Sequence, residues 1–162
     1  MSRVLIISAT KGSNLTLANK LGDLFNCKKK IISLEDFRMP VYTPELDDYD
    51  ISVIKTLSKD FFNSDGLIFC APEYNGGSPP ILTNTITWIS VSVSNWRDAF
   101  LNKKALIASH SGGAGFRFLS TFRVQLEHLG AIVYPRNIIV NNGQKFSKPS
   151  VQKILNGFLD IL

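Results

Sequence analysis

The sequence predicts an α/β fold in which helices cover both faces of a five-stranded parallel sheet. Two observations predict it. Short apolar runs with the length of buried strands alternate along the chain with longer segments whose apolar residues recur at helical spacing. No repeat, low-complexity tract or linker interrupts this alternation. The 162 residues, 44% of them hydrophobic, therefore suit a single domain spanning residues 1–162.

The strands are expected where four or so apolar residues follow one another. A lysine run, Lys28-Lys29-Lys30, stands directly before the second of them, and we expect it to form a solvated turn leading into that strand. Cys70 ends the third and should be a small core residue. The expected strands are Val4–Ile7, Ile31–Ser33, Leu67–Cys70, Ala105–Ala108 and Ala131–Tyr134, with Ile138–Val140 extending or replacing the last.

Five segments between the strands carry one apolar face each, as amphipathic helices do. Gly130 follows the fourth and should terminate it. The acidic residues among positions 45–50 should lie near the positive end of the second helix. The apolar faces fall within residues 17–25, 51–61, 81–89, 118–129 and 151–162.

At this size the natural strand order is 2-1-3-4-5, which makes the fold a flavodoxin-like three-layer sandwich. Right-handed crossovers then place strands 1, 3 and 4 side by side. Ligands of such sheets bind at the carboxyl ends of the strands, beside the switch point. The loops that leave these three strands should therefore form one site.

The first of these loops is polar and opens a helix. It reads Ser8-Ala9-Thr10-Lys11-Gly12-Ser13-Asn14. Hydroxyls, a lysine and the free N–H groups of a helix start make a phosphate site. The loop has neither the triphosphatase pattern nor the Gly-x-Gly-x-x-Gly pattern, so a monophosphate fits best. The alternative is a polar turn in which Ser13 or Asn14 only caps the helix.

The second and third loops are rich in glycine and proline. In the second, Ala71–Pro80, Pro72 stiffens the entry, Gly76 allows close approach of a ligand, and Ser78 and Pro79 suit the start of a helix. It could also be an ordinary tight strand–helix loop. In the third, Ser109–Arg117, glycines let the backbone lie along a flat ligand with its N–H groups exposed.

The residues Pro72-Glu73-Tyr74-Asn75, placed after a buried strand, resemble the signature loop of the NAD(P)H-dependent FMN reductase family, which includes quinone, azo-dye and chromate reductases. The third loop resembles that family's Ser-Gly-Gly segment. In the first loop, Ser8 and Ser13 match the serines of the family's Gly-Ser-x-Arg-x-x-Ser motif. Ile7 replaces its glycine and Thr10 its arginine, although Lys11 follows.

The resemblance implies FMN as cofactor and NADPH or NADH as co-substrate. Hydride would pass through the flavin to a small-molecule acceptor: a quinone, an azo compound, free flavin or a metal oxyanion. It also implies a homodimer or homotetramer and no catalytic acid, base or metal ligand from the chain. The implied cofactor-binding residues are Ser8, Thr10, Lys11, Ser13 and Asn14 at the phosphate, Pro72, Glu73, Tyr74, Asn75 and Gly76 along the ring, and Ser111, Gly112, Gly113 and Gly115 at its other edge.

Composition excludes several other classes. The net charge is +5, but no basic amphipathic helix accompanies the lysine run, so no nucleic acid partner is expected. No apolar run reaches the roughly 20 residues of a membrane span. Two cysteines make neither a disulfide scaffold nor a metal site. The N-terminal residues do not form a targeting segment, so we expect a cytoplasmic protein.

Two alternatives remain: a flavodoxin-like electron carrier and a cofactor-free binding module. The positive charge argues against the carrier, whereas the missing arginine and the missing first glycine of the phosphate loop are the best support for the module.

Overall fold

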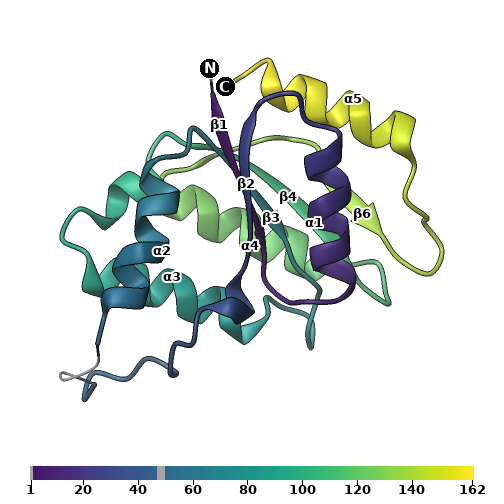
Figure 1. Cartoon of the computed structure of the whole chain (residues 1–162). Coiled ribbons are helices and arrows are strands. Elements are labelled where there is room, and N and C mark those ends of the chain that lie inside the picture. The colour runs from purple at the N-terminus through teal and green to yellow at the C-terminus, as the bar shows by residue number, and fades with distance from the viewer. Residues whose placement is uncertain (1, 47–49) are drawn as a thin grey trace.

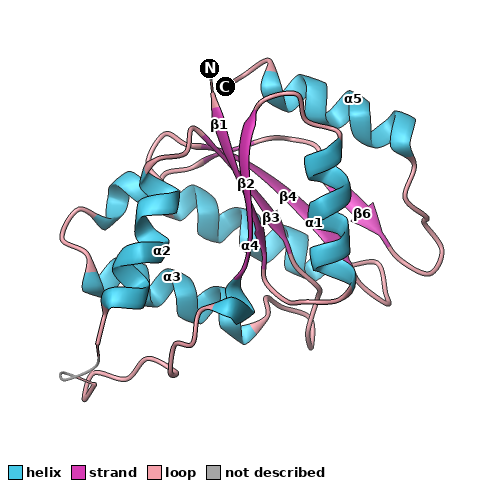
Figure 2. Ribbon diagram, viewed as in Figure 1, coloured by secondary structure: helices cyan, strands magenta, loops and turns pink. Residues whose placement is uncertain are grey.

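The computed structural model describes residues 2–46 and 50–162. The chain forms three layers, with a twisted parallel sheet between two layers of helices (Figures 1 and 2). The strands are β1 (Arg3–Ser8), β2 (Lys28–Ser33), β3 (Gly66–Cys70), β4 (Lys104–His110), β5 (Ile132–Val133) and β6 (Ile138–Val140). The helices are α1 (Ser13–Asp23), α2 (Ser52–Phe62), α3 (Pro80–Ser92), α4 (Phe116–His128) and α5 (Lys148–Leu159), with short 3₁₀ turns η1 (Leu34–Asp36) and η2 (Trp96–Ala99).

The strand order β2-β1-β3-β4-β5 confirms the predicted flavodoxin-like topology, and all pairs are parallel. The register brings the carboxyl ends of the central strands to one level, since Ser8 pairs with both Ser33 and Cys70, and Cys70 pairs with Ala108. The loops that follow these strands therefore start side by side.

The fifth position of the sheet differs from the prediction of one strand. β5 and β6 both pair with β4, β5 with its first residues and β6 with its last. Pro135 lies between them, and a proline has no N–H to donate to a ladder. The sequence left open whether Ile138–Val140 extends or replaces the last strand, and the structure shows that both runs are used.

Two other expectations were wrong. Lys28, Lys29 and Lys30 belong to β2 itself and not to a turn before it, and the ammonium of Lys30 reaches the Asp60 carboxylate at 2.7 Å. α3 begins at Pro80, one residue later than expected, and no side chain caps it. Gly130, with φ 92°, follows α4 as predicted.

The start of α2 was expected to have acidic residues nearby. Asp50 accepts hydrogen bonds from the backbone N–H and the hydroxyl of Ser52, both at 2.9 Å, and these bonds lower the pKa of its carboxyl group. Asp47 and Asp48 lie outside the described residues.

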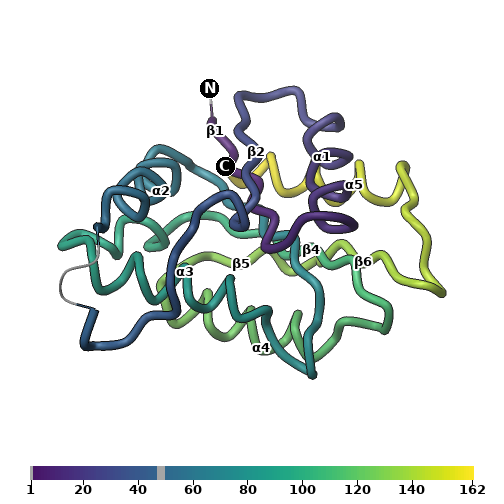
Figure 3. Tube along the Cα trace, turned by 60° about the horizontal axis from the view of Figure 1, so that its bottom comes forward, coloured from purple at the N-terminus to yellow at the C-terminus, as the bar shows by residue number. Residues whose placement is uncertain are grey.

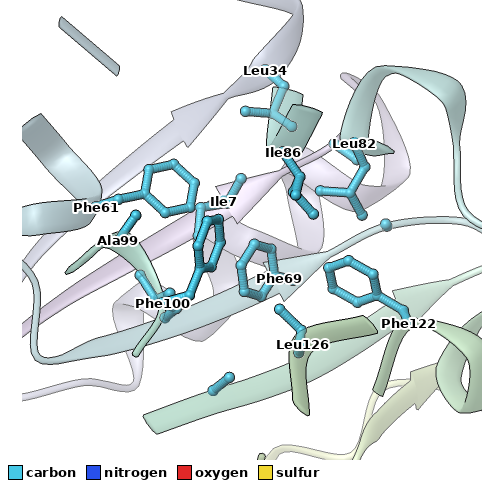
Figure 4. Packing of buried hydrophobic residues seen from close by; sticks show 14 of the residues in the cluster. Ile7, Leu34, Phe61, Phe69, Leu82, Ile86, Ala99, Phe100, Phe122 and Leu126 are labelled. Atoms are coloured by element: carbon cyan, nitrogen blue, oxygen red, sulfur yellow. The ribbon is translucent and has the colours of Figure 1, made fainter. Parts of the chain in front are cut away.

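Two hydrophobic cores lie on the two faces of the sheet. α2, α3 and α4 cover one face and α1 and α5 the other, an arrangement that is also visible in the turned view of Figure 3. Aromatic side chains fill the first core (Figure 4): the rings of Phe69 and Phe122 meet edge to face at 5.1 Å, and those of Phe61 and Phe100 lie 5.7 Å apart. Each buried phenylalanine stabilises the fold by about 3–5 kcal/mol relative to alanine. The sheet that carries the loops is thus a rigid support.

Within residues 2–46 and 50–162, no helix combines the length and the apolar character needed to cross a bilayer.

Candidate functional site

The three predicted loops lie together at the carboxyl edge of the sheet. Loop 1 (residues 9–12) follows β1, loop 2 (71–79) follows β3, and loop 3 (111–115) follows β4. Backbone hydrogen bonds between neighbouring segments continue past the strand ends. The Ala9 N–H donates to Cys70 O at 2.9 Å, and the Ala71 N–H donates to Ala108 O at 3.1 Å. All the predicted site residues belong to these loops or to the strand and helix ends beside them.

Loop 1 leaves the start of α1 open. Gly12, with φ 73°, is the residue before the helix, and no side chain caps the first turn. The structure therefore contradicts the alternative in which Ser13 or Asn14 serves as the cap. A Cβ added at Gly12 would meet no atom within 4 Å. The hydroxyl of the buried Ser8 donates to Thr10 O at 2.7 Å, which holds the turn in shape.

Asn14 connects loop 1 to the end of β4. Its side-chain amide donates to His110 O, and its carbonyl oxygen accepts from His110 N–H, both at 2.9 Å. The side chain is buried. Asn14 therefore fixes the distance between the first and third loops.

Two carboxylates from the turn after β2 contact loop 1. The backbone N–H of Lys11 donates to Glu35 Oε2 at 2.5 Å, and the Lys11 ammonium lies 2.8 Å from Asp36 Oδ1. The bond to Asp36 raises the pKa of Lys11. Sequence reasoning missed both acids. The available signal was the pairing of β1 with β2, which ends both strands beside each other at Ser8 and Ser33.

Loop 2 contains a tight turn at Tyr74–Gly77. The backbones of Tyr74 and Gly77 exchange hydrogen bonds of 3.1 and 2.9 Å. Both central residues have positive φ, 50° at Asn75 and 76° at Gly76, as a type I′ turn requires. This conformation suits asparagine and glycine and leaves Tyr74 49% exposed at the tip.

Glu73 joins loop 2 to α4. Its carboxylate accepts the backbone N–H groups of Arg117 and Phe118 at 2.9 and 3.1 Å, so it caps a helix that begins 43 residues later. Its own N–H donates to Ser111 Oγ at 2.8 Å, and the hydroxyls of Ser109 and Ser111 are 2.9 Å apart. Glu73 is thus held on both sides by loop 3 and the start of α4.

Loop 3 exposes its backbone. Gly112 and Gly113 are exposed, and a Cβ at either would meet nothing within 4 Å. Gly115, with φ 71°, is buried against Ser109 and precedes α4. The Arg117 side chain packs toward Gly76 of loop 2. A Cβ added at Gly76 would lie 3.2 Å from Cδ of Arg117.

A cavity of about 340 Å³ lies between the start of α1 and the ends of β4 and β6, on the α1 side of the sheet. Ser13, Thr16, Lys20 and His110 supply its polar lining, and Phe146 is among its apolar residues. His110 therefore lines a hollow beside the loops, although its backbone is used by Asn14.

The described residues contain no group of three or more histidine, cysteine, aspartate or glutamate residues able to hold a metal ion. Cys70 is fully buried, and burial raises the pKa of its thiol. The site offers backbone donors, hydroxyls and open space beside a rigid sheet edge, which is an arrangement for binding a ligand.

Known proteins resemble the chain over most of its length. The family described as NADPH-dependent FMN reductase matches residues 2–145. An NADPH azoreductase of Bacillus sp. strain OY1-2 is 22% identical over 144 residues, which cover 86% of this chain and 76% of that protein. A 2-hydroxy-1,4-benzoquinone reductase of Burkholderia sp. is 25% identical over 118 residues, 72% of this chain and 60% of that one.

Among solved structures, the flavoenzyme NAD(P)H:(acceptor) oxidoreductase of Paracoccus denitrificans superposes with a TM-score of 0.80 over 99% of this chain and 96% of that one, at 18% identity. At that identity the likeness concerns the fold.

Proposed function

Since the chain belongs to the NADPH-dependent FMN reductase family and is an FMN-dependent oxidoreductase, we propose that its three clustered loops hold the flavin and open it to a small acceptor. The observation that carries this proposal is the open backbone at one sheet edge. The uncapped start of α1, the I′ turn of loop 2 and the exposed Gly112-Gly113 segment all lie there. These features fit a ligand with one phosphate and one flat ring.

The phosphate would lie at loop 1. Thr10, Lys11 and Ser13 offer hydroxyls, an ammonium group and N–H groups at a helix start. Ser8 and Asn14 would contribute by shaping the loop, because their side chains already bind Thr10 and His110. An arginine fork is absent from loop 1, so the phosphate would be held mainly by backbone and hydroxyl donors.

The ring would lie between loops 2 and 3. Pro72, Glu73, Tyr74, Asn75 and Gly76 would frame one side, and Ser111, Gly112, Gly113 and Gly115 the other. When bound there, FMN would supply the redox chemistry of hydride transfer from the nicotinamide to the acceptor. The N–H groups of the glycine loop would stabilise the negative charge that reduction creates. Protons would come from solvent, because the Glu73 carboxylate is engaged as a helix cap.

The acceptor would be flat and aromatic. Tyr74 at the tip of loop 2 is 49% exposed, and Phe116 at the start of α4 is 64% exposed. Aromatic rings stack favourably on such side chains. The azo and quinone substrates named for two relatives support this choice, which includes quinones, azo compounds and free flavin. A metal oxyanion has no ring to stack on these side chains, so this argument does not support that class of acceptor.

The same exposed aromatic residues support a homodimer or homotetramer, which light scattering on the purified protein would detect.

A cytoplasmic location is proposed because NADPH and NADH are supplied there, and cell fractionation would test it.

The proposal is tested by titrating the purified protein with FMN and then assaying it. We expect the flavin absorption bands to shift on binding, and NADPH or NADH to be oxidised when a quinone is added. Binding without nicotinamide oxidation would indicate an electron carrier instead. A protein that leaves the FMN spectrum unchanged at saturating protein concentration would refute the flavin site.

The sequence left a cofactor-free binding module as an alternative, and membership of the FMN reductase family argues against it. Lys11, the cation of loop 1, is nevertheless already paired with Asp36, and its N–H is bound to Glu35. These contacts bear on how tightly loop 1 would hold a phosphate.

A further inference from the structure

Loop 1 already binds an anionic oxygen. The Lys11 N–H donates to Glu35 Oε2 at 2.5 Å, and the acceptor of this hydrogen bond is a charged carboxylate. Glu35 reaches this position because η1 follows β2 directly, and β2 ends beside β1. The carboxylate therefore lies where the loop would present a backbone donor to a phosphate oxygen.

Asp36 affects the second donor of the same residue. Its carboxylate lies 2.8 Å from the Lys11 ammonium, in a pair whose side chains are 57% and 58% exposed. The pair offsets the positive charge that Lys11 gives loop 1. Consecutive residues of one short turn thus engage both the backbone and the side-chain donor of Lys11.

Glu73 provides the comparison on the same sheet edge. Its carboxylate is half-buried and accepts two backbone N–H groups, while its own N–H is held by Ser111. That contact is a fixed part of the framework. Glu35, by contrast, is exposed and accepts one N–H, and exposed charge contacts contribute little to stability. A competing dianion can therefore replace it.

We propose that Glu35 is a specificity-determining residue that stands in for the flavin phosphate and must leave Lys11 when FMN binds. With Asp36, it weakens the hold on the phosphate and makes FMN an exchangeable ligand. This inference rests on the proposed flavin site.

Comparing two flavins tests the inference, because riboflavin has the same ring without the phosphate. The purified wild-type protein (residues 1–162), Glu35→Ala, Asp36→Ala and the control Glu45→Ala are each titrated with FMN and with riboflavin. Glu45 is an exposed carboxylate outside the three loops, so its removal changes the net charge equally. Unfolding midpoints confirm that each variant is folded.

Glu35→Ala should bind FMN on the order of tenfold more tightly, the change expected for freeing one hydrogen-bond donor to a charged group. Asp36→Ala should also tighten FMN binding, and riboflavin affinity should change by less than about twofold in both variants. Glu45→Ala should leave both affinities at wild-type values. On gel filtration, Glu35→Ala should retain FMN that the wild type loses.

Equal changes for FMN and riboflavin, or weaker FMN binding in Glu35→Ala, would overturn the role of Glu35 while leaving the flavin site intact. Wild-type protein that keeps stoichiometric FMN on gel filtration would also overturn it. Failure of all four proteins to bind either flavin would refute the proposed function, and this inference with it.

Discussion

Asn14 and His110 exchange two hydrogen bonds of 2.9 Å, which join the first turn of α1 to the end of β4 across 96 residues of sequence. The asparagine satisfies both backbone groups of His110 with one buried side chain. The spacing of loops 1 and 3 therefore depends on this residue.

Replacing Asn14 by alanine should destabilise the protein by about 2–3 kcal/mol, because the N–H and the carbonyl of His110 would lose their partner. FMN affinity should fall as well, since the two loops would no longer be held together. Urea unfolding and flavin titration measure these effects. Asn19→Ala, at an exposed position on the same helix, should stay within about 0.5 kcal/mol of the wild type. A stable Asn14→Ala protein would show that the sheet alone positions the loops.

Glu73 should be required for its hydrogen bonds more than for its charge. Glu73→Ala removes the cap of α4 and should cost about 1–2 kcal/mol, with at least a tenfold loss of FMN affinity. Glu73→Gln keeps an oxygen that accepts the same N–H groups and should recover most of both losses. Thermal unfolding and flavin titration of the two variants test this. Equal damage from both substitutions would instead assign the role to the negative charge.

Ser33 should be dispensable for stability. Its hydroxyl oxygen is buried and finds no hydrogen-bond partner within residues 2–46 and 50–162. Ser33→Ala should therefore leave stability unchanged or raise it by up to about 1 kcal/mol. Ser64 is equally buried, but its hydroxyl donates to Asp60 O at 2.7 Å. Ser64→Ala should cost about 1 kcal/mol in the same urea unfolding experiment, and equal effects of the two substitutions would contradict the argument.

Cys70 should make the folded protein less stable at alkaline pH. Burial raises the pKa of its thiol above the ordinary value near 9, so the unfolded chain loses this proton at a lower pH than the folded protein does. The resulting stabilisation is complete well below pH 9 and is lost above it, with a slope that approaches about 1.4 kcal/mol per pH unit. Urea unfolding should show a total loss of about 1.4 kcal/mol between pH 8 and 10 for the wild type relative to Cys70→Ala. Parallel curves for the two proteins would show that the thiol titrates similarly in both states.

The topology was predictable because it follows from local patterns. Runs such as Leu67–Cys70 have the length of buried strands, and their alternation with helical segments leaves few possible folds. The grouping of the three loops followed from the strand order. The lysines of β2 were misplaced because three consecutive charges resemble a solvated turn, and only the pairing with β1 places them in a strand.

The detailed contacts of the site were not predictable in the same way. Glu73 and Arg117 are 44 residues apart, and their hydrogen bond depends on how α4 leaves loop 3. The contact between Glu35 and Lys11 depends on how far η1 turns back after β2. Side chains that join distant loops leave no periodic signal, so the sequence identifies the loops without showing what holds them together.

The lysines of β2 affect how this molecule meets others. β2 is the outer strand of the sheet on its side, and Lys28, Lys29 and Lys30 are exposed along it. A second copy that tried to extend the sheet there would bring like charges face to face, which opposes intermolecular β-sheet formation and aggregation. Two copies of the chain would then associate through helices or loops.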